Sequence, residues 1–479
     1  MTEKRPFYIT STIPYVNAEP HIGFAFELVQ SDAIARYKRL MGKDVFFSTG
    51  TDEYGQKIWE ASQKEGKTVQ NYVDYYAQKF LDLKTTLNLS CDNFIRTTSQ
   101  EHILATQEFW RLCDAKGDIY KKIYKGLYCV GCEKFITKKD LINDKCPFHL
   151  TGELETVEEE NYFFKLENYQ KQLLEYLSNE KVIFPEWRRK EAIDFVQNAL
   201  EDFSISRCKE RVSWGIPIPD DDKQVMYVWF GAFVNYISTL GWPDSKGSFE
   251  KFWLRGEKVQ TAGKDMVKFQ SVMWQGMLMS AGFPTTDTII YHGFITGEGG
   301  IKMSKSLGNV ISPNDIVKEY GTDALRYFLL REISPFEDSP FTMERFKEAY
   351  NANLANGLGN LISRILTLSE KYLDKCPKIP EKSDFTEFFG FFEKFDIKQT
   401  MDYIWNEIGE LDKFIQKTEP FKVVKVNEKK GKELISDIVI RLYRIAGILN
   451  PIMPETNILL KKLIKENKKP EKPLFPRKN

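Results

Sequence analysis

Three cysteines and one histidine lie close together in the stretch YCVGCEKFITKKDLINDKCPFH. Cys129 and Cys132 form a C-x2-C pair, and Cys146 and His149 form a C-x2-H pair after a short spacer. Three thiolates and one imidazole at this spacing can complete a tetrahedral zinc site. Reduced structural cysteines or a redox pair are the alternatives, but a redox pair explains neither Cys146 nor His149. Because all four ligands come from the protein, the sequence predicts a structural zinc with no position open for water.

A second group of residues has the character of a phosphate site. His21 and Gly23 stand where a β-rich run, residues 7–13, leads through a Pro-containing turn into a helical pattern. The N-terminus of a helix offers unpaired N–H groups and a favourable dipole to an anion, and glycine lets the anion come close. Further along, the glycine-rich segment 296–313 presents Lys302 and Lys305, two cations suited to a charge that exists only briefly. A surface histidine and a solvated turn are the ordinary alternatives.

The elements that would hold these residues alternate between strand and helix. After a helix over residues 22–41, the segment 45–58 repeats the arrangement with Asp52 in its turn and a helix that stops near Gly66. Two such units predict an α/β fold with a parallel sheet whose site lies at the carboxyl ends of the strands. Residues 71–115 are predicted to be helical, with His102 exposed.

The last part of the chain is predicted to be helical. An apolar stripe recurs at helical spacing from Leu354 to Leu368, and a separate polar stripe is formed by Asn356, Asn360 and Arg364. Later helices are expected over residues 395–418, 431–450 and 454–466, which would complete a helix bundle.

Bulk properties restrict the class of protein. With 479 residues the chain is long enough for about three domains. No segment has the length and apolarity of a membrane span, and the first residues, MTEKRPFYITST, resemble no signal or transit peptide, so we expect a cytoplasmic protein. Seven cysteines in so long a chain favour a reducing compartment. The net charge of zero gives no general indication of nucleic acid, and the basic clusters alone suit solvated faces.

HIGF at 21–24 together with KMSKS at 302–306 resembles the signature pair of class I aminoacyl-tRNA synthetases. Six further motifs are similar to those of the methionyl-tRNA synthetase family: PYVNAEPHIG, TGTDEYG, YVWFGAFVNY, GKDMVKF, YHGFI and YNANLANGLGNLISR. The likeness runs from about residue 5 to residue 450. It implies a Rossmann-type doubly wound catalytic domain with a zinc-containing insertion and a C-terminal α-helical bundle. The expected domains are the catalytic halves at 1–116 and 223–295, the insertion with its zinc knuckle at 117–222, the KMSKS loop and linking segment at 296–348, and a helical anticodon-binding domain with a basic tail at 349–479.

The resemblance also implies a reaction. The methionine carboxylate attacks the α-phosphorus of ATP to give methionyl-adenylate and pyrophosphate, and the methionyl group then passes to the 3′-terminal adenosine of methionine tRNA. No protein nucleophile is needed, so catalysis is positioning and charge stabilisation, with His21, Lys302 and Lys305 as catalytic residues. Mg²⁺ is expected to enter with ATP.

Substrate contacts follow from the same resemblance. The expected ATP-binding residues are His21, Gly23, Glu27, Gly263, Asp265, His292, Gly293, Lys302 and Lys305. Asp52 is expected to hold the α-ammonium group of methionine, and the other methionine-binding residues are Ile13, Tyr15, Trp229, Ala232, Tyr236, Met266, Gln270 and Trp274. The anticodon is expected to contact Asn360, Arg364 and Phe421. Because no appended dimerising domain follows the helical part, we expect a monomer.

Four positions depart from the family pattern. Phe24 replaces the second histidine of the signature, Gln270 a histidine beside the methionine pocket, Gly231 an aspartate, and Phe421 a tryptophan in anticodon recognition. They indicate a divergent member with a lower rate or altered amino-acid tolerance. Two alternatives therefore stay open: a class I synthetase for another amino acid, and a catalytically impaired tRNA-binding relative. The length of the insertion disfavours the first, and the intact His21, Asp52 and lysine pair disfavours the second.

Overall fold

The computed structural model describes residues 5–129, 134–136, 141–142, 144–146, 154–244, 247–301, 303, 310–379 and 386–478. The chain divides into two units, each with its own internal contacts. The first unit consists of Met1–Pro20, Lys43–Asp82 and Cys91–Tyr291, and the second of His21–Gly42, Leu83–Ser90 and His292–Asn479.

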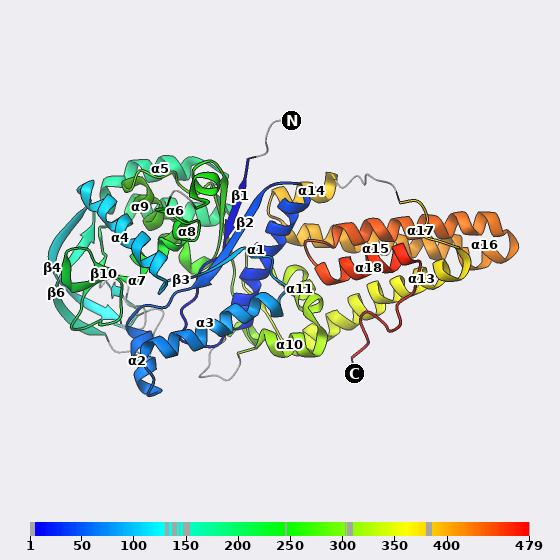
Figure 1. The fold of residues 1–479 in the computed structure, drawn as a ribbon, viewed down its shortest axis with the longest axis horizontal. Helices are drawn as coiled ribbons and strands as arrows, with labels where there is room; N and C mark the ends of the chain where they lie inside the picture. The colour runs from blue at the N-terminus through cyan, green and yellow to red at the C-terminus, as the bar shows by residue number, and fades with distance from the viewer. Residues whose placement is uncertain are drawn as a thin grey trace. The chain divides into compact units, whose positions relative to one another are not determined.

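A six-stranded sheet forms the centre of the first unit (Figure 1). Its strand order is β3-β2-β1-β12-β13-β7, and each described pairing within it is parallel. The strands are β1 (Phe7–Thr10), β2 (Val45–Thr51), β3 (Asn93–Arg96), β7 (Ile183–Phe184), β12 (Glu257–Gly263) and β13 (Thr288–His292). β1 lies between β2 and β12, where the order of the strands reverses, and in sheets of this kind ligands bind outside the carboxyl ends of the strands at that point. The predicted α/β class with a parallel sheet is confirmed.

The sequence of the central strands explains their position. All four residues of β1 are buried, and in β2 only one of seven is not fully buried. Such nearly continuous apolar and β-branched runs are typical of parallel strands covered on both faces. Two large aromatic side chains, Trp253 and Trp274, are completely buried in the same core, as is Tyr291 of β13.

The helices that follow the first strands differ in one place from the prediction. The region 71–115 is not helical throughout: α3 (Val69–Thr86) and α4 (Gln100–Ala115) are separated by β3. β3 has only four residues and is set by pairing with β2, in which Ser48 lies opposite Asn93. A pairing between distant segments overrides the local pattern there. The helix expected after Gly55 is present as α2 (Gln56–Lys64).

The prediction that His102 is exposed is wrong. His102 lies on α4 and has an exposed fraction of 0%. Its Nδ1 lies 2.9 Å from the hydroxyl of Ser238 and its Nε2 lies 3.2 Å from that of Thr106. Burial lowers the pKa of His102 to about 3, so the ring is neutral at physiological pH. The polar residues beside it in the sequence gave no sign of these two partners.

Two antiparallel sheets complete the strands of the first unit. One has the order β5-β4-β6-β8, with β4 (Ile119–Cys129), β5 (Lys134–Ile136), β6 (Glu155–Phe164) and β8 (Phe203–Ser204). The other has the order β10-β11-β9, with β9 (Ser206–Cys208), β10 (Pro217–Ile218) and β11 (Asp221–Met226). The remaining α-helices are α5 (Gln170–Ser178), α6 (Glu186–Asn198), α7 (Val228–Phe233), α8 (Asn235–Ser238) and α9 (Trp274–Ser280).

The second unit is mainly helical (Figure 1). It contains α1 (Ile22–Leu40), α10 (Pro313–Tyr320), α11 (Thr322–Arg331), α12 (Met343–Ala349), α13 (Asn360–Tyr372), α14 (Thr386–Glu393), α15 (Ile397–Thr418), α16 (Pro420–Val426), α17 (Glu428–Ile448) and α18 (Pro454–Glu466). A further helical segment, Tyr350–Gly359, leads into α13, and a short parallel pair joins β14 (Ile295–Thr296) to β15 (Ser339–Pro340).

α17 packs against α13, α15, α16 and α18. The predicted apolar stripe faces this core, because Leu354, Leu358, Leu361 and Ile365 are buried, whereas Leu368 is half-buried. The three later helices of the prediction correspond to α15, α17 and α18. Within the ranges that the structure describes, no helix is both long and apolar enough to cross a membrane.

Candidate active site

Asp52 directly follows β2 at the carboxyl edge of the parallel sheet. Its backbone N–H donates to the carbonyl of Pro14 (2.9 Å), and its carbonyl accepts from Val16 N–H (3.2 Å). These two bonds pair Tyr15 with Asp52 and tie the turn after β1 to the end of β2. The side chain is buried. A carboxylate is therefore held beside Tyr15 at the end of the sheet where ligands bind in this fold.

An aromatic cluster lies next to this carboxylate. The rings of Tyr15 and Trp229 form a T-shaped pair with 6.2 Å between their centroids, and Trp229 is stacked on Phe269 with 4.5 Å between centroids. Phe233 and Tyr236 both contact Trp274, at 5.9 and 5.8 Å between ring centroids. Aromatic rings in such edge and stacked contacts form a firm apolar wall.

The structure thus brings together four of the predicted methionine-binding residues through ring contacts: Tyr15, Trp229, Tyr236 and Trp274. Met266 packs against the same core, whereas Ile13 is half-buried on the turn after β1. The prediction did not include Phe233 and Phe269. Phe233 belongs to the same aromatic run as Trp229, so its place in that run was an available signal.

A small cavity lies beside Asp52 and Ala232, with Tyr54, Ile216 and Gly231 among its lining residues. Gly231 stands where the family pattern has an aspartate. A Cβ atom at Gly231 would lie 3.1 Å from Cδ1 of Ile216, so a larger side chain requires Ile216 to move. The absence of a side chain at this position therefore matches the local packing.

Gln270 lies in the helical segment Phe269–Met273 and has an exposed fraction of 0%. Its backbone carbonyl accepts from Nε2 of Gln275 (2.8 Å). Neither its side-chain oxygen nor its side-chain nitrogen has a hydrogen-bond partner among the described residues. Burying an amide in this way is costly, because the group loses its bonds to water.

Two of the predicted ATP-binding residues follow β12. Gly263 is the last residue of β12 and is buried, and Asp265 is exposed on the short helical turn Lys264–Met266 that comes next. Both are therefore at the carboxyl end of a strand of the parallel sheet, as the prediction requires.

The other described residues of the predicted ATP site belong to the second unit. His21 caps α1, and its Nδ1 accepts from the N–H of Gly23 (3.1 Å). The His21 side chain is exposed, and a Cβ atom at Gly23 would lie 2.9 Å from the ring. Glycine thus lets the imidazole fold over the start of the helix. Ile22 N–H donates to the carbonyl of Ile311 (3.0 Å), which ties this helix start to the segment before α10.

Glu27 and His292 form a buried pair. Nε2 of His292 lies 2.8 Å from Oε2 of Glu27, and Nδ1 lies 2.8 Å from the carbonyl oxygen of Gly293. Both ring nitrogens lie within hydrogen-bond distance of oxygen atoms, so the ring is held on both sides. A Cβ atom at Gly293 would overlap the backbone of Glu337, at 2.1 Å, so only glycine fits there. The structure brings these three predicted residues together.

The predicted zinc ligands are partly within the described ranges. Cys129 and Cys146 are both buried, in one small cluster with Leu141 and Leu154. Two buried sulfur donors in one cluster fit a structural zinc site. Cys132 and His149 lie outside the described residues, as do Lys302 and Lys305. Among the residues that are described, no three metal-binding side chains gather at one point.

The predicted anticodon residues lie on helices of the second unit. Asn360 is exposed at the start of α13, and Phe421 is exposed on α16. Nη1 of Arg364 forms an ion pair with Oδ1 of Asp412 at 2.7 Å, which links α13 to α15. The pair leaves Arg364 half-exposed.

Comparison with known protein families identifies one class of enzyme. A family model described as "tRNA synthetases class I (M)" matches residues 7–153 and 136–366. The chain is 38% identical to "Methionine--tRNA ligase" of Thermotoga maritima, over 97% of this chain and 76% of that protein. It is 39% identical to "Methionine--tRNA ligase" of Clostridium acetobutylicum, over 96% of this chain and 73% of that protein.

Solved structures agree with this. The Mycobacterium tuberculosis methionyl-tRNA synthetase in complex with methionyl-adenylate has a TM-score of 0.91 and 33% identity, over 99% of this chain and 100% of that chain. The apo form of that synthetase has a TM-score of 0.83 and 30% identity, over 99% and 98%. The chain therefore belongs to the methionyl-tRNA synthetase family, and the resemblance described from the motifs is confirmed.

Proposed function

We propose that this protein activates methionine with ATP, releasing pyrophosphate, and transfers the methionyl group to the 3′-terminal adenosine of methionine tRNA. The observation that carries the proposal is the buried carboxylate of Asp52 beside the aromatic cluster around Trp229, at the carboxyl edge of the parallel sheet. A carboxylate next to an apolar aromatic wall suits an amino acid with an ammonium group and a soft thioether.

On the methionine side, Asp52 binds the α-ammonium group and leaves the substrate carboxylate free to attack the α-phosphorus. Tyr15, Trp229, Tyr236 and Trp274 enclose the thioether, because sulfur packs favourably against aromatic edges. Ile13, Ala232, Met266 and Gln270 complete the proposed pocket. Shape of this kind discriminates by about 1–3 kcal/mol per methylene.

On the ATP side, His21 contacts the phosphates as pyrophosphate separates from the α-phosphoryl group, and Gly23 lets the phosphates approach the start of α1. Gly263 lets the nucleotide approach the backbone, Asp265 holds the ribose hydroxyls, and His292 with Gly293 borders the adenine. Glu27 is a further ATP-binding residue. Lys302 and Lys305 neutralise the departing pyrophosphate. Mg²⁺ bound with ATP supplies additional positive charge at the phosphates.

Further features of the proposal rest on the sequence. Cys129, Cys132, Cys146 and His149 would hold one structural zinc within the insertion 117–222, and the helices of 349–479 would bind the anticodon through Asn360, Arg364 and Phe421. The five predicted domains, a monomeric state and a cytoplasmic location remain predictions.

The direct test is methionine-dependent exchange of pyrophosphate into ATP, measured with methionine, leucine, isoleucine, valine and cysteine. Methionine should support exchange far better than the other four. Exchange with leucine or cysteine and none with methionine would contradict the proposal. Binding of methionine tRNA without any exchange would instead support the alternative of a catalytically impaired relative, for which Lys305→Ala would have no measurable effect.

A further inference from the structure

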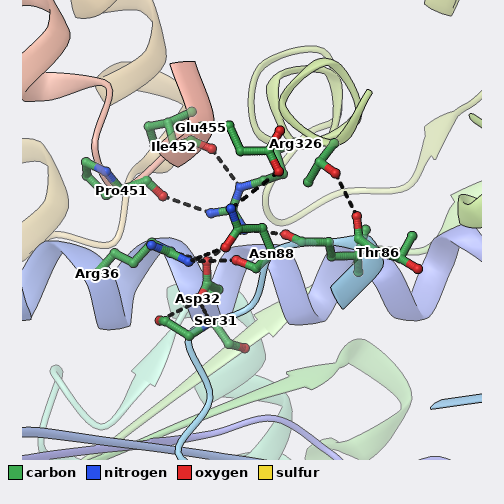
Figure 2. A network of polar contacts seen from close by, with 12 residues as sticks. Ser31, Asp32, Arg36, Thr86, Asn88, Arg326, Pro451, Ile452 and Glu455 are labelled. Carbon is green, nitrogen blue, oxygen red and sulfur yellow. Dashed lines mark hydrogen bonds and ion pairs between the residues drawn. The ribbon is translucent and has the colours of Figure 1, made fainter. Parts of the chain in front are cut away.

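Arg326 of α11, shown with its partners in Figure 2, is an arginine that the sequence motifs do not include. Its side chain has an exposed fraction of 0%. Nε donates to the carbonyl of Ile452 (2.8 Å) and Nη2 to that of Pro451 (3.0 Å), both in the connection between α17 and α18. Nη1 donates to the carbonyl of Leu87 (3.0 Å) and forms an ion pair with Asp32 of α1 (2.7 Å). One guanidinium thus joins four segments of the second unit.

Asp32 is the acidic centre of the same network, and its side chain is also completely buried. Its Oδ2 forms an ion pair with Arg36, one turn along α1 (2.7 Å). Its Oδ1 accepts from both the backbone N–H and the hydroxyl of Ser90, each at 2.6 Å. Arg326 and Arg36 lower the pKa of Asp32 despite its burial, so the carboxylate is charged.

The loop between α3 and β3 is bound to Asp32 and Arg36 of α1 by hydrogen bonds. Arg36 donates to the carbonyl of Asn88 (2.6 Å) and to its side-chain oxygen (3.1 Å). Asn88 has a left-handed backbone (φ 49°), which asparagine tolerates better than most residues. Thr322, at the start of α11, donates to the carbonyl of Thr86 (2.9 Å). The position of α1 is therefore set by hydrogen bonds to defined backbone atoms and not by apolar packing alone.

Only arginine has the geometry for this role. A guanidinium presents five N–H donors in a fixed plane, whereas a lysine ammonium is one compact charge on a flexible stem. Lysine could keep the ion pair with Asp32, but it cannot reach the carbonyls of Leu87, Pro451 and Ile452 at the same time.

The network fixes the helix that carries His21. Asp32 lies eleven residues after His21 in the chain, which is about 16 Å along a helix. A rotation of α1 by about 5° around Asp32 would move His21 by roughly 1.4 Å, and misplacement by about 1 Å can reduce a rate about 100-fold. We propose that Arg326 is a positioning residue for methionine activation, which aligns α1 with the α17–α18 connection so that His21 meets the phosphates of ATP. This inference rests on the proposed function.

The test compares Arg326→Lys and Arg326→Met with the same two changes at Arg345. Arg345 is a matched control because it also donates to backbone carbonyls of the second unit, those of Pro340 (2.7 Å) and Glu332, and has no described contact with α1. Pyrophosphate exchange is measured at varied methionine and varied ATP, and kcat is normalised to the number of active sites titrated by adenylate formation.

Arg326→Lys should lower kcat per active site about tenfold or more. KM for methionine should stay within about twofold, because the proposed methionine-binding residues all belong to the first unit. The Arg345 variants should keep the kcat of the unchanged protein. Arg326→Lys keeps the positive charge beside Asp32. It can therefore be used for the kinetic comparison if Arg326→Met does not fold.

Three results would contradict the proposed function or the positioning role of Arg326. If the unchanged protein shows no methionine-dependent exchange, the proposed function fails. If it does, and Arg326→Lys has the kcat of Arg345→Lys, the positioning role alone fails. A lower number of active sites with unchanged kcat and KM would indicate loss of folded protein only, and would likewise overturn the positioning role.

Discussion

Asp52 and Tyr15 come from different strand ends, and two backbone hydrogen bonds bring them side by side. The carboxylate is buried next to an aromatic ring, where water competes weakly for a bound cation. An ammonium group in this position gains charge-assisted hydrogen bonds that are stronger than those to an exposed carboxylate.

Asp52→Asn should therefore weaken methionine binding more than it changes ATP binding. A hydrogen bond to a charged group contributes about 1.5–3 kcal/mol, so KM for methionine should rise about 10- to 100-fold. Exchange assays at varied methionine measure this, with Asp44→Asn, an exposed carboxylate of the same unit, as the control. An unchanged KM would show that Asp52 does not bind the ammonium group.

The sequence predicted these residues because family motifs identify them, and the structure shows why some neighbours were missed. His102 and its partners Thr106 and Ser238 are polar residues that form a buried group, and nothing in their local pattern distinguishes them from surface residues. Arg326 was missed because three of its partners are backbone carbonyls, which carry no residue-specific signal. In the sequence, the only indication of that network was the spacing of four residues between Asp32 and Arg36, which allows an ion pair on one face of a helix.

At the scale of elements, the start of α18 depends on a carboxylate from another helix. Oδ2 of Asp323, in the first turn of α11, accepts from the backbone N–H of Thr456 in the first turn of α18 (2.6 Å). Desolvation raises the pKa of Asp323 to about 6, although the bonds from Thr456 and the charge of Arg326 act in the opposite direction. Glu455 adds to the rise.

This pKa leads to a prediction about pH. Because the folded pKa is raised above the unfolded value of about 3.9, the folded state binds the proton more tightly. The stabilising contribution is present at low pH and is lost as the pH rises through about 6. Asp323→Asn keeps an acceptor for Thr456 without the charge, so it should increase the free energy of unfolding by about 1–3 kcal/mol at pH 7.5 and by about half as much at pH 5. Urea unfolding at both pH values measures this, and an equal difference at the two would contradict it.

The buried cluster of Cys129 and Cys146 leads to a second prediction for an element. Cys146→Ser should reduce bound zinc from one per chain to nearly none and make the region around residues 129–149 sensitive to proteolysis, because a structural zinc contributes directly to local folding. Cys208→Ser is the matched control, since Cys208 lies in β9 outside the cluster. Metal analysis measures the zinc content of each purified protein. Zinc retained in Cys146→Ser, or absent from the unchanged folded protein, would refute the site.

At the scale of the whole molecule, the elements predicted with most success are those with long patterns. The strands β1 and β2 are apolar runs, and α15, α17 and α18 have clear apolar stripes, so their positions follow from burial. β3 was not predicted, because its four residues, NFIR, have no such pattern and form a strand by pairing with β2. The order of the strands could be inferred only through the family resemblance, because no local pattern records which strands are neighbours.

The edge strand β7 has a consequence for any shortened form of the chain. Its two residues pair with β13 and come from within the segment 117–222, which the resemblance identifies as an insertion. Deleting that segment would leave Ile289 and Ile290, both buried, on a strand with unsatisfied N–H and carbonyl groups. Such an edge recruits strands from other molecules. The segment 117–222 thus covers this edge of the parallel sheet, and we expect its removal to favour aggregation.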